Sequence, residues 1–110
     1  MRGGSRCLRV TGAARSVQLP DIPTIAESGV PGYEATTWNG VAAPARTPPL
    51  IITALNRELA RLLALHDVSE TFLKQGTQPQ SSTPEAFGSK IRNEISQWST
   101  LVKTIGLELE

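Results

Sequence analysis

Two residues could carry reactive or metal-binding chemistry, the single histidine His66 and the single cysteine Cys7. They lie far apart in the sequence and match no zinc-ligand spacing. No nucleophile or partner motif accompanies either one, so His66 is expected to have a structural or surface role and Cys7 to act as a small apolar residue. The GVPGYE segment lacks the spacing and the lysine of a phosphate-binding loop. The sequence therefore predicts no enzyme, no metal site and no cofactor.

Acidic residues fall mostly where helices are expected to begin. A carboxylate in the first turn interacts favourably with the free N–H groups and the dipole of a helix, so these positions are explained without acid–base catalysis. The residues concerned are Glu27, Asp67, Glu70 and Glu85. No pair of catalytic carboxylates can be singled out among them.

Trp38 allows two interpretations. It stands beside Gly40 on a segment that alternates apolar and polar residues. A glycine lets a small molecule approach the backbone, so the indole could form the wall of a ligand cleft. The same indole could equally pack against helices, and the residues alone leave both readings open.

The size and charge of the chain exclude several classes of protein. With 110 residues it forms one domain or a part of one, and its net charge is +1. Four arginines and no acid occupy the first fifteen residues, but without interleaved aromatic residues they do not predict a nucleic-acid partner. No apolar run approaches the roughly 20 residues of a membrane helix, and no secretion signal is visible, so the chain as written is expected to stay in the cytoplasm.

The first part of the chain is expected to be mostly extended. Residues 1–6 are predicted as a flexible lead-in, and residues 7–11 and 33–43 alternate in the manner of strands. Between them, Thr24 and Glu27 have the spacing of a capping box for a short helix, and Gly29 is placed to end it. The last four residues, LELE, also alternate and are predicted as either an edge strand or a frayed tail.

Three helices are predicted in the second part. Thr47-Pro48 and Thr83-Pro84 each read as an N-cap followed by a first-turn proline. Asp67 and Glu70 form a capping-box pair for a short helix through Lys74, with Gly76 as its stop. The first and third helices carry apolar stripes, which consist of Ile51, Ile52, Leu55, Leu59, Leu62 and Leu63, and of Phe87, Ile91, Ile95, Trp98, Val102 and Ile105 before Gly106.

Several of these motifs, taken in order, resemble the C-terminal part of the extracytoplasmic solute receptors of tripartite tricarboxylate transporters, the Bug-type periplasmic binding proteins. The matching residues are Val10-Thr11, Arg15-Ser16, the run LPDIPT from Leu19, the run ESGVPGY from Glu27, Trp38-Asn39-Gly40, Ala43-Pro44, Thr47-Pro48 and the helix start TPEAF. Asn39 and Arg46 depart from the family pattern. The resemblance extends over essentially the whole chain from Leu8.

The resemblance implies an α/β fold: the C-terminal portion of a type II periplasmic binding protein fold, with two or three strands and three packed helices. It implies crossing strands and a hinge-proximal segment over residues 7–44, and the helical part of the first lobe over residues 45–110. Because the rest of both lobes and the signal peptide are missing from the sequence, the chain is expected to be a truncated receptor. The full-length family is periplasmic and works with membrane transporter subunits.

Two functional hypotheses follow. In the first, the full-length protein closes two lobes around a small carboxylate or related organic solute, with Thr11, Gly12 and Trp38 as ligand-binding residues. A hydroxyl and a free N–H can satisfy a carboxylate, and the indole excludes water. In the second, the chain is a self-associating interaction domain without a ligand pocket, because its apolar helix faces have few strands to cover.

Overall fold

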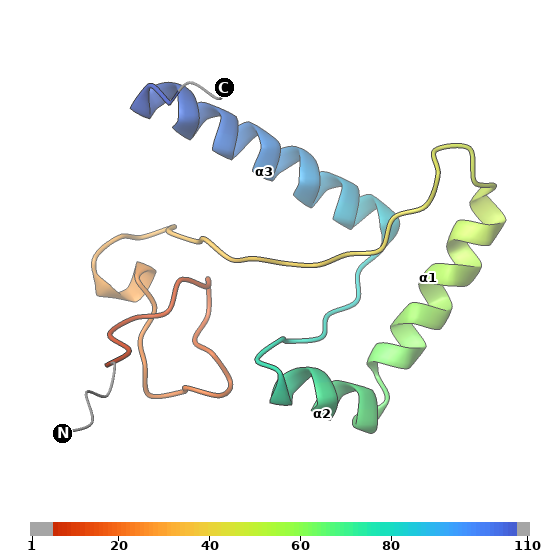
Figure 1. Ribbon diagram of the computed structural model, residues 1–110, viewed down its shortest axis with the longest axis horizontal. Coiled ribbons are helices and arrows are strands. Elements are labelled where there is room, and N and C mark those ends of the chain that lie inside the picture. Colours follow the sequence, from red (N-terminus) through yellow and green to blue (C-terminus); the bar gives the residue numbers. More distant parts are fainter. Residues whose placement is uncertain (1–5, 108–110) are drawn as a thin grey trace. The chain divides into compact units, whose positions relative to one another are not determined.

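The computed structural model describes residues 6–107, and the chain divides into two compact units, Met1–Ala42 and Ala43–Glu110. The first unit contains one short 3-10 helix, η1 (Ala26–Ser28). The second contains three α-helices: α1 (Pro49–Leu63), α2 (His66–Lys74) and α3 (Pro84–Ile105) (Figure 1). The predicted flexible lead-in and the LELE tail fall largely outside the described residues.

The two predicted strands do not form within residues 6–107. Residues 7–11 contribute one isolated parallel bridge, between Val10 and Thr24, and residues 33–43 are extended without strand pairing. A strand is stable only when a neighbour satisfies its backbone N–H and C=O groups and covers one face, and these segments have no such neighbour in the described residues. The α/β class is therefore not confirmed by strands, whereas the three helices are present.

The third helix begins and ends as predicted. The Thr83 hydroxyl accepts a hydrogen bond from the Ala86 N–H at 3.1 Å, and Pro84 occupies the first helical position. At the other end Gly106 adopts the left-handed conformation, with φ of 69°. A residue without Cβ reaches this conformation at little cost, which explains the stop.

The predicted start of α1 is wrong by one residue. The helix begins at Pro49, Pro48 precedes it with φ of −57° and ψ of 139°, and no side chain caps it. A residue before proline is pushed out of helical geometry. Because both Thr47 and Pro48 precede a proline, neither can start the helix, and Thr47 lies too far back to cap it.

The capping box predicted for α2 is also wrong. The helix already begins at His66, so Asp67 has helical geometry and cannot serve as the N-cap. Glu70 instead pairs along the helix with Lys74, at 3.0 Å, and lies 3.8 Å from His66. Gly76 has φ of 77° just after the helix, as expected for its stop.

The apolar stripes of α1 and α3 are exposed. None of the three helices has a buried residue among those described, and Ile95 in the middle of α3 is 62% exposed. Within the second unit, α1 contacts α2, and the Asn56 side chain donates to the Ser82 carbonyl at 2.8 Å. The predicted packing of these helices on a sheet is thus not seen in residues 6–107.

Candidate functional site

The first unit is built around Thr24, which is 1% exposed and is the only fully buried side chain among the described residues. Its hydroxyl accepts from the Glu27 N–H at 3.0 Å, while the Glu27 carboxylate accepts from the Thr24 N–H at 2.8 Å. The Thr24 carbonyl accepts from the Ser28 hydroxyl at 2.7 Å. The predicted capping box is confirmed, and Gly29, with φ of 115°, ends η1 as expected.

Thr24 also anchors the segment that carries two of the predicted site residues. The Val10 N–H donates to the Pro23 carbonyl at 3.1 Å, and the Ile25 N–H donates to the Val10 carbonyl at 3.0 Å. One residue further along this segment, the Thr11 carbonyl accepts a hydrogen bond from the Ala35 N–H at 2.9 Å. Thr11 is therefore held between the Thr24 region and the extended segment of residues 33–43.

Gly12 lies close to the same extended segment. A Cβ built on it would lie 3.1 Å from the Ala14 carbonyl oxygen and 3.8 Å from the Thr36 methyl group. The first distance is tighter than ordinary van der Waals contact, so glycine fits here better than any larger residue. Within residues 6–107, neither the Thr11 hydroxyl nor the Gly12 N–H makes a hydrogen bond.

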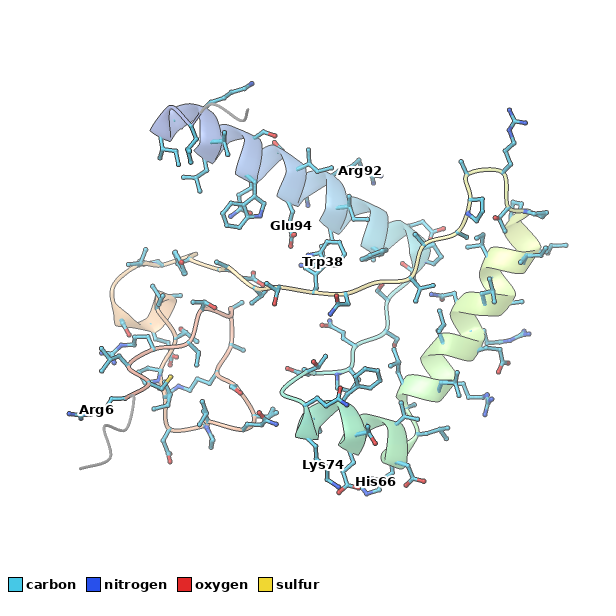
Figure 2. The ribbon with its side chains drawn as sticks, viewed as in Figure 1. Arg6, Trp38, His66, Lys74, Arg92 and Glu94 are labelled. Atoms are coloured by element: carbon cyan, nitrogen blue, oxygen red, sulfur yellow. The ribbon has the colours of Figure 1, made fainter. Side chains whose placement is uncertain are left out.

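Trp38 lies two residues beyond Thr36 on the extended segment and is 38% exposed (Figure 2). The structure brings Thr11 and Gly12 next to residues 35 and 36 of this segment, but no hydrogen bond joins Trp38 to either of them. The three residues remain predicted ligand contacts.

Arg15 and Glu27 form an ion pair in the first unit. The guanidinium reaches both carboxylate oxygens, with Nε at 3.1 Å from each and Nη2 at 2.9 Å from Oε1, and Nη1 donates to the Pro20 carbonyl at 3.2 Å. The hydrogen bonds from Arg15, with those from Thr24, lower the pKa of Glu27 to about 2. Glu27, in turn, raises the pKa of Arg15. The guanidinium charge is thus already paired.

This pair is the part of the site that the residue pattern did not reveal. Arg15 belongs to a family motif and Glu27 to a capping box, but the two residues are separated by 12 positions. A spacing signal comes from helix or strand periodicity or from a short capping motif, and a separation of 12 residues through this irregular segment matches none of these. Their contact forms across two turns, which are closed by the bonds from the Leu19 N–H to the Ser16 carbonyl and from the Ile22 N–H to the Leu19 carbonyl.

The other candidate reactive residues are exposed. The His66 side chain is 89% exposed on α2, where Figure 2 shows it together with Lys74. Cys7 is an exposed free thiol whose Sγ lies 3.7 Å from the Arg9 carbonyl. Over residues 6–107 there is no group of three metal-binding side chains, and no helix there is long and apolar enough to cross a membrane.

Comparison with known proteins decides the family. The profile of the TctC family, the tripartite tricarboxylate transporter family receptors, matches residues 1–107. The chain belongs to this receptor family. The resemblance predicted from the motifs is therefore confirmed, and the family is one of transport receptors rather than a class of enzymes. Membership favours the solute-receptor hypothesis over the self-associating interaction domain.

Individual relatives of the TctC family support the assignment. The chain is 37% identical over 108 residues to protein BugT of Bordetella pertussis, covering 98% of this chain and 33% of BugT. It is 39% identical over 98 residues to the UPF0065 protein in the tcbD-tcbE intergenic region of Pseudomonas sp. strain P51, covering 88% of this chain and 29% of the relative. The chain thus spans about a third of the length of these receptors.

A solved structure extends the likeness to the fold. R. palustris Rpa4515, determined with adipate, is similar with a TM-score of 0.73 and 38% identity over 90% of this chain and 33% of the other. This chain therefore shares the fold of a portion of Rpa4515.

Proposed function

We propose that this chain forms part of a solute receptor that binds a small carboxylate for uptake by the membrane subunits of a tripartite tricarboxylate transporter. The observation that carries the proposal is the similarity to Rpa4515, at 38% identity and a TM-score of 0.73, because that receptor was determined with adipate, a dicarboxylate. The receptor works in the periplasm, where family members meet their solutes. It catalyses no bond chemistry, and affinity is tied to closure around the ligand.

Within this chain we assign ligand contacts to Thr11, Gly12 and Trp38. An ionised carboxylate only accepts hydrogen bonds, so it needs donors, and the Thr11 hydroxyl and the Gly12 N–H are donors without a partner in residues 6–107. Arg15, three residues after Gly12, is engaged by Glu27, and the guanidinium of Arg9, three residues before Gly12, donates to the adjacent Leu8 carbonyl. Carboxylate recognition by this segment therefore falls to uncharged donors, with the Trp38 indole limiting access of water.

A hybrid receptor tests the proposal. Residues 6–107 replace the matching third of Rpa4515, and adipate binding is measured by calorimetry beside adipamide, which has the same carbon skeleton without charge. We expect the hybrid to bind adipate and not adipamide. Thr11→Val should weaken binding about 10-fold or more, because a hydrogen bond to a charged group contributes about 1.5–3 kcal/mol.

Matched variants make the test specific. Thr11→Ser keeps the hydroxyl and should bind like the hybrid, and Thr53→Val changes an exposed threonine of α1 as the control. Trp38→Ala should weaken adipate binding. Gly12→Ala should also weaken it, because the added Cβ would crowd the Ala14 carbonyl. Unchanged adipate affinity in Thr11→Val, Gly12→Ala and Trp38→Ala together would show that the solute is bound elsewhere.

A further inference from the structure

The segment that carries the proposed donors is attached at both ends. On its N-terminal side the backbone of Val10 bonds to Pro23 and Ile25, and the Thr11 carbonyl accepts from Ala35. On its C-terminal side the attachment is the Arg15 side chain, through its contacts with Glu27 and Pro20. Residues 12–14 between these attachments are bends without helix or strand structure.

Backbone hydrogen bonds do not hold these three residues. Within residues 6–107, no hydrogen bond is made by the N–H groups of Gly12, Ala13 or Ala14. A short segment without internal hydrogen bonds is ordered only by what fixes its ends, and its free donors serve a ligand well only if they are ordered before binding. The Arg15 contact is the attachment at the C-terminal end of residues 12–14.

The Glu27 carboxylate, which Arg15 contacts, is itself held in place by other bonds. Glu27 is held by the reciprocal bonds with Thr24, and Thr24 is buried. The carboxylate thus presents both oxygens in one orientation to a planar guanidinium. Such a two-oxygen pairing defines direction as well as distance, which a single charge contact cannot do.

We propose that Arg15, paired with Glu27, is a positioning residue that orders Gly12, Ala13 and Ala14 so that their free amides can receive a carboxylate of the solute. The inference rests on the proposed function and adds two amides, those of Ala13 and Ala14, to the candidate contacts. Arg15 does not contact the solute. Its role is to hold the segment whose neutral donors do.

The test measures backbone order on the full 110-residue chain labelled with 15N, and solute binding on the hybrid receptor. Backbone order parameters are determined without ligand for the wild type, Arg15→Gln and Glu27→Gln. Arg9→Gln is the control that removes the same charge, since the Arg9 guanidinium donates to the adjacent Leu8 carbonyl. We expect values for residues 12–14 to fall from about 0.85 to below about 0.6 in both pair variants and to stay unchanged in the control.

Two further measurements distinguish a loss of positioning at residues 12–14 from a general destabilisation of the first unit. The amide signals of Val10 and Ile25 should persist, and the double variant Arg15→Gln with Glu27→Gln should lower the order of residues 12–14 no further than either single change, because both remove one shared contact. If Arg15→Gln loses the Ile25 signal, Arg15→Lys takes its place and should give intermediate order. Wild-type order at residues 12–14 in Arg15→Gln or Arg15→Lys would overturn the inference.

Adipate is then added to the 15N-labelled hybrid receptor, which carries residues 6–107 either as the wild-type sequence or with Arg15→Gln. Shifts of the Gly12, Ala13 and Ala14 amides in the wild type that weaken at least several-fold in Arg15→Gln would support both proposals. Loss of order in Arg15→Gln without any adipate-dependent shift in the wild type would leave positioning by Arg15 in place and refute the assignment of the solute to this segment. The two failures are therefore distinguishable.

Discussion

The Arg15 guanidinium donates hydrogen bonds to both carboxylate oxygens of Glu27, at nitrogen–oxygen distances of 2.9 to 3.1 Å. The two residues are 12 positions apart in a segment with little regular structure. Both side chains are close to half exposed, 45% and 46%, so solvent screens the attraction and the pair contributes little to global stability. The pair instead fixes the position of the segment that carries Arg15. It connects the bends at residues 12–14 to the buried Thr24.

The first prediction concerns pH. The pKa of Glu27 is about 2 in the folded chain, below the usual 4.5, chiefly because Arg15 and then Thr24 donate to its carboxylate. A lowered folded-state pKa means that the stabilising contribution is fully present above about pH 4.5 and is lost as pH falls toward 2. Arg15→Gln should raise the pKa of Glu27 toward 4.5 without reaching it, since the Thr24 bonds remain. A 13C titration of the Glu27 carboxyl signal measures this, and an unaltered pKa would contradict the pairing.

The second prediction concerns Thr24. Thr24→Val keeps the shape of the side chain but removes the acceptor for the Glu27 N–H. The loss of such a cap costs about 1 kcal/mol, so hydrogen exchange at the Glu27 and Ile25 amides should accelerate about 5-fold. The control is Thr53→Val on α1, which should leave these rates unchanged. Equal rates in Thr24→Val and the wild type would mean that the buried hydroxyl does not stabilise this region.

The third prediction contrasts two threonines that have the same sequence context. Thr83 caps α3 through the Ala86 N–H, whereas Thr47 caps nothing because α1 begins at Pro49. Thr83→Ala should therefore destabilise its helix by about 1 kcal/mol, and Thr47→Ala should have almost no effect. Circular dichroism during thermal unfolding measures both. A similar loss in the two variants would refute the shifted start of α1.

The fourth prediction contrasts two glycines of α3. Gly106 has φ of 69°, so Gly106→Ala should destabilise the helix end by about 1 kcal/mol. Gly88 lies inside the helix, where an added Cβ meets only the end of the flexible Arg92 side chain at 3.3 Å. Gly88→Ala should therefore raise helicity, with a gain of up to about 1 kcal/mol. Far-ultraviolet circular dichroism should show opposite changes, and changes of the same sign would contradict the assignment.

The helix ends show how far local sequence can predict structure. Thr83, Gly106 and the Thr24–Glu27 box were predicted correctly because each depends on atoms within four residues of one another. The start of α1 was missed because Pro49 pushes Pro48 out of helical geometry, and the start of α2 was missed because the helix begins one residue before Asp67, the expected cap. Boundaries are where such small free energies compete.

By itself the sequence determined the family, the three helices and most of the residues at which these helices end. Motif order and helical periodicity both depend only on the spacing of residues along the chain. Only the tertiary structure decided that Arg15 meets Glu27, that Thr11 bonds to Ala35, and that Gly12 lies against Thr36. It also decided that the segments 7–11 and 33–43 do not pair as strands within residues 6–107. These outcomes depend on which distant groups are available as partners, and no local periodicity encodes that.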